Sequence, residues 1–179
     1  MRKYSVIYAD PPWQYHNKPQ GKGPEDHYQT MPIEEICALP VKELSDKDCA
    51  LFMWVTLPFL RDCFKVVDAW GFKYKTVAFV WIKQNRVNDG IFWGMGMWTR
   101  SNAEICILAV KGNPKRTAAN IHQVIISHVQ EHSRKPNEAR LRIEALMGNV
   151  PRIELFARET PPGWDVWGNE VNSDINMQA

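Results

Sequence analysis

Apolar and polar residues along the chain follow two periods, one typical of buried strands and one typical of helices. Strand-like runs, rich in β-branched and aromatic residues, cover residues 3–9, 50–55, 73–82, 103–110, 123–127 and 152–156. Helices are predicted over residues 32–39, 58–70 and 136–147, from prolines at their first turns and from glycines after the last two. Because strands alternate with helices, the pattern predicts a three-layer α/β/α domain with a mostly parallel sheet. A ligand crevice is expected at the carboxyl ends of the strands.

Two long segments show neither period. Residues 14–31 are polar and contain several glycines and prolines, and residues 85–100 are rich in glycine, asparagine and aromatic residues. Loops of this length are uncommon in compact domains, and those that occur are usually functional. We therefore expect both loops to lie near the crevice.

The composition fits a single domain over residues 1–179, because 45% of the residues are hydrophobic. No apolar run approaches the roughly 20 residues that span a membrane, and the first residues lead into a strand rather than a signal peptide, so we expect a cytoplasmic protein. The four cysteines form no Cys-x-x-Cys pair, which argues against a disulfide framework and a zinc site. A formal net charge of +2 allows a nucleic-acid partner without requiring one.

The motif Asp10-Pro11-Pro12-Trp13 follows the first predicted strand directly. An adenine amine is a poor nucleophile because its lone pair is delocalised into the ring. The Asp10 carboxylate and the Pro11 carbonyl could each accept one amine N–H and orient the nitrogen for attack, while Trp13 could stack on the base. The same four residues could also be a turn that ends a strand, with its aspartate bonded to nearby backbone.

Four longer segments in the same order decide between these interpretations. They are YADPPWQY, HYQTM, GMGMWTRSNAEICILAVKG and SRKPNEARLRIEALMGNVPRIELFARETPPGWDVWGNE, and together they cover most of the chain. In these segments the sequence resembles the N6-adenine methyltransferase family that includes the catalytic subunit of the mRNA adenosine methyltransferase and many small bacterial and phage proteins. The resemblance implies a Rossmann-like class I methyltransferase fold and S-adenosyl-L-methionine as cofactor.

The resemblance also implies the members of the site. The catalytic motif would comprise Asp10, Pro11, Pro12 and Trp13, and the base pocket would be framed by Tyr28 and Trp98. Cofactor contacts would come from Asp10, Lys135, Glu154, Phe156, Arg158, Asn169 and Glu170. Lys135 would bind the methionine carboxylate, which suits a cation beside a predicted helix N-terminus.

The sequence departs from the family pattern in two places. The loop between Arg158 and Trp164 is shorter than in the eukaryotic catalytic member, so no role is carried over inside it. Only nine residues precede Asp10, whereas that relative uses upstream residues to contact the cofactor. We therefore expect part of the pocket for the cofactor's adenine to come from elsewhere.

Basic residues in or beside loops that we expect near the crevice are candidates for contacts to the phosphates of the substrate, although most charged loop residues are simply solvated. They are Lys18, Lys22, Arg86, Arg100, Lys111, Lys115 and Arg116. The histidines His122, His128 and His132, with Glu131, match no standard metal motif, and methyl transfer from a sulfonium requires no metal. No metal is expected.

The expected reaction is transfer of a methyl group to the exocyclic N6 amine of adenine in DNA. DNA is favoured because the compact chain resembles the bacterial and phage members of the family. Three alternatives stay open: adenine methylation in RNA, an inert scaffold that binds nucleic acid beside an active partner, and methylation of a small molecule or protein. The resemblance to the family is compatible with a homodimer. Because no room is left between the catalytic and cofactor motifs for a separate target-recognition domain, we expect a sequence preference that is short or relaxed, or one supplied by a heteromeric partner subunit.

Overall fold

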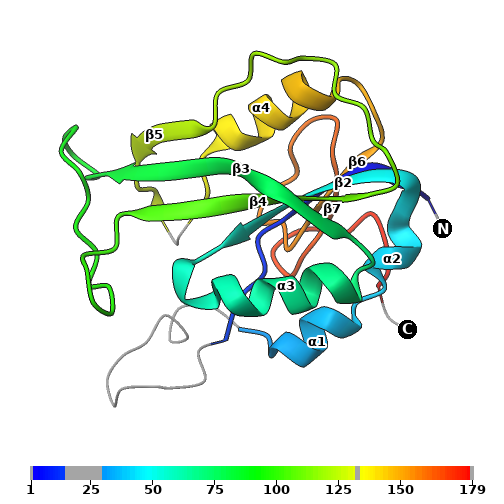
Figure 1. Cartoon of the computed structure of the whole chain (residues 1–179), viewed down its shortest axis with the longest axis horizontal. Coiled ribbons are helices and arrows are strands. Elements are labelled where there is room, and N and C mark those ends of the chain that lie inside the picture. The colour runs from blue at the N-terminus through cyan, green and yellow to red at the C-terminus, as the bar shows by residue number, and fades with distance from the viewer. Residues whose placement is uncertain (1, 15–29, 132–133, 178–179) are drawn as a thin grey trace.

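The computed structural model describes residues 2–14, 30–131 and 134–177, which form one seven-stranded sheet with helices on both faces (Figure 1). The strand order is β5-β3-β4-β2-β1-β6-β7. The strands are β1 (Tyr4–Ala9), β2 (Ser45–Val55), β3 (Lys73–Gln84), β4 (Ala103–Lys111), β5 (Val124–His128), β6 (Arg152–Leu155) and β7 (Asp165–Trp167). The helices are α1 (Ile33–Ala38), α2 (Val41–Leu44), α3 (Leu60–Ala69) and α4 (Asn137–Met147), with a 3-10 turn η2 (Leu57–Phe59) before α3.

Successive apolar side chains of the central strands belong to two separate cores, one on each face of the sheet. In β1, Ile7 joins the cluster that packs against α1 and α3, whereas its neighbours Val6 and Tyr8 join the cluster that packs against α4. Successive side chains of a strand point to opposite faces, so one buried strand supplies both cores. Figure 1 shows the resulting layers, with α4 on one side of the sheet and α1 and α3 on the other. The predicted three-layer α/β/α fold is confirmed.

One strand runs against its neighbours. β4 is antiparallel to both β2 and β3, whereas the other pairings in the sheet are parallel. The start of β4 therefore lies at the edge where β1, β2, β6 and β7 end. This edge collects Asp10 after β1, Thr56 after β2, Glu104 near the start of β4, and Phe156 after β6.

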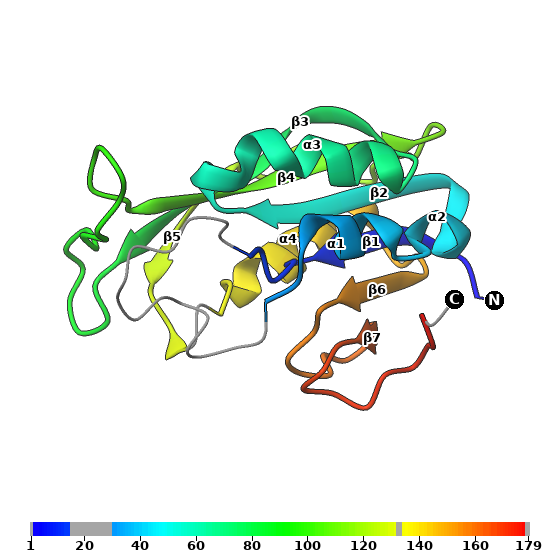
Figure 2. The same cartoon turned by 90° about the horizontal axis from the view of Figure 1, so that it is seen from below.

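The observed elements differ from the predicted ones mainly where the apolar pattern is weak. β2 begins at Ser45 rather than at residue 50, because its first residues, SDKDC, are too polar to read as a buried strand. β7 was missed because it has three residues and needs β6 beside it to form. Figure 2 shows β7 beyond β6 at one end of the sheet.

Within the described residues, no helix has the length and apolar character needed to cross a membrane. In the same part of the chain, no group of at least three histidine, cysteine, aspartate or glutamate residues is arranged to hold a metal ion.

Candidate active site

The first strand places a carboxylate at the edge of the sheet where the parallel strands end. Asp10 follows β1 directly, and Pro11 and Pro12 end the strand because proline has no N–H for the ladder. Backbone bonds hold the turn: the Trp13 N–H donates to the Pro11 carbonyl over 2.9 Å, and the Met31 N–H donates to the Pro12 carbonyl over 2.8 Å. The Asp10 side chain is 26% exposed, so a ligand can reach a carboxylate that the turn holds in place.

Four charged side chains of alternating sign lie next to one another along this edge of the sheet, beginning with Asp10. Lys135 Nζ lies 2.9 Å from Asp10 Oδ2 and 3.2 Å from Glu104 Oε2. Glu104 Oε1 accepts a hydrogen bond from Lys83 Nζ over 2.5 Å. The Lys135 and Glu104 side chains are only 10% and 8% exposed, so water screens these pairs much less than it screens surface pairs.

Burial and charge act on these groups in opposite directions. Burial raises the pKa of the Asp10 carboxyl above its ordinary value, and Lys135 only partly offsets that effect. Burial also acts to raise the pKa of Glu104, but the charges of Lys135 and Lys83 outweigh it and hold this pKa below its ordinary value. Burial acts to lower the pKa of Lys135, yet Asp10 and Glu104 raise it. Lys135 and Glu104 thus stay charged, whereas Asp10 takes up a proton more readily than an ordinary aspartate.

Three cavities surround this group of charges. Two of them, of about 80 and 280 Å³, share Asp10, Phe156 and Arg158 in their walls and lie on the side of β6 and β7. A third, of about 660 Å³, lies on the opposite side and is lined by Lys83, Glu104 and the end of the loop between β3 and β4. Volumes of a few hundred Å³, as in the two larger cavities, are typical of small-molecule sites. The charged group therefore stands between the two cavities beside β6 and β7 and the third cavity.

The backbone is specialised where β6 and β7 end. Phe156, directly after β6, has a φ of +61° and is the one non-glycine residue in the described part of the chain with positive φ. Such conformations cost energy outside glycine and cluster at ligand sites. Gly168, directly after β7, has no room for a side chain, because a Cβ there would lie 2.2 Å from the Ala157 carbonyl oxygen. Both residues line the cavity of about 280 Å³.

Comparison with known proteins identifies the family. Residues 4–170 match the model of the MT-A70 family, which is nearly the whole chain. The chain belongs to the MT-A70 family. This assignment confirms the resemblance recognised in the sequence and, with it, the class I methyltransferase fold.

The relatives of this MT-A70 domain differ in length. It is 35% identical to the Type II methyltransferase M.MunI of Mycoplasma sp, over 95% of this chain and 78% of that protein. It is 34% identical to the N(6)-adenosine-methyltransferase MT-A70-like of Arabidopsis thaliana, over 94% of this chain and 24% of the relative. It is 33% identical to the human N(6)-adenosine-methyltransferase catalytic subunit METTL3, over 96% of this chain and 29% of the relative. The chain therefore spans most of the first relative and about a quarter of the other two.

The structure brings the predicted cofactor residues of the MT-A70 domain together. Asp10, Lys135, Glu154, Phe156 and Arg158 line the cavity of about 80 Å³. Asn169 and Glu170 line the adjoining cavity of about 280 Å³. Lys135, predicted to bind the methionine carboxylate, already pairs with Asp10 and Glu104 within the protein, so it also organises the site without a ligand.

The predicted catalytic motif is divided between the site and the core. Asp10 and Pro12 line a cavity, whereas Trp13 is 6% exposed and stacks on Phe59 with ring centroids 5.7 Å apart. The Trp13 Nε1–H also donates to the Trp54 carbonyl over 3.3 Å. Trp13 therefore has the surroundings of a core residue that anchors the turn, and its stacking on a base stays a prediction.

The residues that the sequence predicts to bind the substrate do not lie together. Trp98 is 99% exposed and belongs to the wall of the cavity of about 660 Å³, where a base could reach it. Tyr28 and Lys18 lie outside the described residues. Lys115 and Arg116 follow β4, and the expectation that they lie near the crevice is wrong.

The direction of β4 explains why Lys115 and Arg116 lie far from the crevice. Because β4 is antiparallel, it ends at the edge where β2 begins, and the loop after it contacts that edge: the Asn113 N–H donates to Asp48 Oδ1 over 2.7 Å. The Thr117 N–H further along donates to the Leu146 carbonyl at the end of α4. In Figure 1 this loop leaves the sheet at the side opposite the loop between β3 and β4. Lys115 and Arg116 are thus separated from Asp10 by the length of the sheet.

A charge-removal experiment tests this placement. The double variant Lys115→Ala and Arg116→Ala should leave KM for an adenine-containing oligonucleotide within about twofold of wild type, because surface charges far from a site are screened by salt. Steady-state methyl transfer at about 0.15 M salt measures it. A rise in KM of tenfold or more would contradict the placement, and Arg100→Ala beside Trp98 serves as the variant that should raise KM.

Sequence reasoning missed the charged residues that support the site, above all Lys83 and Glu104. A signal was present, because Glu104 interrupts the otherwise apolar run AEICILAV, and a carboxylate in a buried strand needs a partner. The sequence does not identify that partner, because Lys83 lies in β3 and Lys135 in the loop before α4.

Proposed function

We propose that this MT-A70 domain transfers a methyl group from S-adenosylmethionine to the exocyclic N6 amine of adenine in DNA. The observation that carries the proposal is the position of Asp10, which lines the two cavities beside β6 and β7 while its partner Lys135 contacts Glu104 in the wall of the third. A cofactor in the first two cavities would meet the Asp10 carboxylate directly, and Lys135 and Glu104 connect that carboxylate to the third cavity, where a base could reach Trp98. N6-adenine methylation agrees with the names of the adenosine-methylating relatives.

The cofactor site comprises the two adjoining cavities around Asp10, Phe156 and Arg158. Their walls suit S-adenosylmethionine, because the carboxylates present can accept hydrogen bonds from ammonium and ribose hydroxyl groups. Glu154 Oε2 is a buried acceptor with no hydrogen-bond partner among the described residues. When bound, S-adenosylmethionine supplies an electrophilic methyl group on a positively charged sulfur.

The residues of the turn after β1 act on the amine. The Asp10 carboxylate accepts one amine N–H, and the Pro11 carbonyl, which already accepts the Trp13 N–H, has a second lone pair for the other. Both bonds orient the nitrogen lone pair, and the negative charge of Asp10 stabilises the positive charge that the nitrogen gains as the bond to the methyl carbon forms and the bond from that carbon to the cofactor's sulfur breaks. The Asp10 carboxylate or water then takes the surplus proton of the amine. Lys135 favours the ionised form of Asp10 and holds its carboxylate in position.

The relation to M.MunI supports DNA as the polymer. This relative, named as a Type II methyltransferase, is matched over 78% of its length, whereas METTL3 is matched over 29%. RNA is the second candidate, because adenine presents the same amine in both polymers and the identities of 35% and 33% are nearly equal.

Methyl transfer from labelled cofactor to matched oligonucleotides tests the proposal. Single-stranded DNA, duplex DNA and RNA of one sequence are compared, with an oligonucleotide whose adenines are already N6-methylated as the negative control. We expect kcat/KM for one form of DNA to exceed that for RNA at least about tenfold, which corresponds to about 1.4 kcal/mol in transition-state binding. A preference for RNA would transfer the proposal to RNA. Cofactor binding without transfer to any polymer would instead favour a scaffold or a requirement for a partner subunit.

A further inference from the structure

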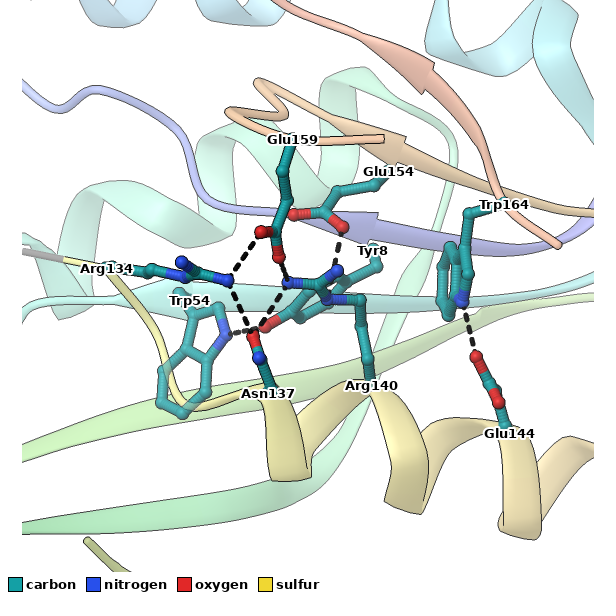
Figure 3. Close-up of polar contacts among 9 residues, drawn as sticks. All are labelled: Tyr8, Trp54, Arg134, Asn137, Arg140, Glu144, Glu154, Glu159 and Trp164. Carbon is teal, nitrogen blue, oxygen red and sulfur yellow. Dashed lines mark hydrogen bonds and ion pairs between the residues drawn. The ribbon is translucent and has the colours of Figure 1, made fainter. Parts of the chain in front are cut away.

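Two arginines and two glutamates form part of the wall of the cavity of about 80 Å³, on the side of α4 (Figure 3). They are Arg134, Arg140, Glu154 and Glu159. Glu159, in the loop after β6, binds one arginine with each carboxylate oxygen: Arg134 Nη2 lies 2.5 Å from Oε2, and Arg140 Nη2 contacts Oε1. Asn137 Oδ1 accepts from both arginines, over 3.3 and 3.1 Å. These contacts hold the guanidinium of Arg140 in one orientation.

In that orientation, the remaining side of Arg140 faces Glu154. Arg140 Nε lies 3.4 Å from Glu154 Oε2, and the two side chains are 11% and 13% exposed. Glu154 Oε2 has no hydrogen-bond partner among the described residues, so Arg140 and Glu154 interact chiefly through their charges. Figure 3 shows Glu154 reaching from β6 toward Arg140 on α4.

Glu154 is surrounded by charges of both signs. Burial raises its pKa to about 7, Arg140 lowers it, Asp10 and Glu159 raise it, and Arg134 lowers it slightly. Lys135 and Arg158 line the same cavity, Tyr8 is its neighbour on β1, and its neighbour on β7 is the uncharged Val166. Arg140 is the cation with the strongest effect on Glu154, so its loss should raise the pKa of Glu154 further.

We propose that Arg140 is a positioning residue for the cofactor, which holds Glu154 as an ionised acceptor in the wall of the cavity. This inference rests on the proposed function, because it concerns binding of S-adenosylmethionine to the same cavities. Arg140 does not itself need to touch the cofactor. It acts through Glu154, whose carboxyl group accepts hydrogen bonds at both oxygens, and carries the charge that attracts an ammonium group, only when it is ionised.

Cofactor affinity as a function of pH tests this role. The Kd of S-adenosylmethionine, measured by calorimetry from pH 6 to pH 9, should fall in the wild type as Glu154 ionises near pH 7. In Arg140→Gln the same fall should be displaced upward by about one pH unit or more, with binding weaker by on the order of fivefold at pH 7 and mostly regained at pH 9. Arg140→Lys keeps the positive charge and should restore most of the wild-type profile.

Two further variants make the result specific. The cofactor's own amine and Asp10 also titrate, so Glu154→Gln, which has no carboxylate at this position, gives the profile of those other groups without Glu154. Arg142→Gln removes another arginine of α4, one that pairs with Glu138 and not with Glu154, and its profile should overlay the wild type. Carbon NMR of the Glu154 carboxyl in the free protein should show the same upward displacement of its pKa in Arg140→Gln.

The possible outcomes separate the inference from the proposed function. A displaced profile in Arg140→Gln, with Arg142→Gln unchanged, supports the positioning role. Overlaid profiles of wild type and Arg140→Gln, or a pH-independent loss of affinity in Arg140→Gln, would overturn it and leave the proposed function standing. Absence of cofactor binding by the folded wild type at every pH would overturn both.

Discussion

Asp10→Asn is expected to lower kcat for methyl transfer by at least about a hundredfold, and by up to about a thousandfold, which is the range for losing one preorganised electrostatic contact at a reacting centre. The substitution keeps the size of the side chain and removes its charge. The amine nitrogen then gains positive charge without a facing carboxylate. Single-turnover transfer with saturating cofactor measures the chemical step apart from binding and product release.

The pH dependence of the wild type should point to the same group. Because burial raises the pKa of Asp10, activity should decline on the acidic side at a higher pH than an ordinary aspartate would produce. Asp68→Asn, on the exposed face of α3, is the matched control and should retain wild-type activity. Near-normal turnover of Asp10→Asn, with intact folding, would remove Asp10 from the proposed chemistry.

Glu104→Ala is expected to lower the free energy of unfolding by about 3–5 kcal/mol, because it leaves Lys83 and Lys135 buried without their shared partner. Urea unfolding followed by circular dichroism gives the value. Glu138→Ala removes a side chain that is 47% exposed and pairs with Arg142, and it should lower the free energy of unfolding by less than about 1 kcal/mol. A loss below 1 kcal/mol for Glu104→Ala would mean that water screens the two lysines far better than their burial indicates.

The stabilisation by Glu104 should also depend on pH. Its pKa is lower in the folded protein than its ordinary value, so its contribution is complete above that ordinary value and is lost as the pH falls through the lower folded pKa. Between neutral pH and strong acid, the wild type should therefore lose more stability than Glu104→Ala does. Parallel curves for the two proteins would show that Glu104 is not held ionised by Lys135 and Lys83.

Much of the fold could be predicted because most of its strands contain an apolar run with a clear end. The run before Asp10-Pro11-Pro12 predicts a buried strand and the position of its carboxyl end, and local chemistry decides both. The long matching segments were equally local information, and they identified the family. By contrast, β7 and the first half of β2 carry weak patterns, and they form because neighbouring strands pair with them.

Local sequence thus determined which strands form, where Asp10 lies and which family the chain belongs to. The tertiary structure decided which side chains meet Asp10. An apolar run looks the same whether its strand runs parallel or antiparallel, because strand direction depends on pairing between segments distant in the chain. The antiparallel direction of β4 brings Glu104 to the site and carries Lys115 and Arg116 away from it. Packing likewise buried Trp13 against Phe59 and turned Arg140 toward Glu154, contacts that no spacing along the chain encodes.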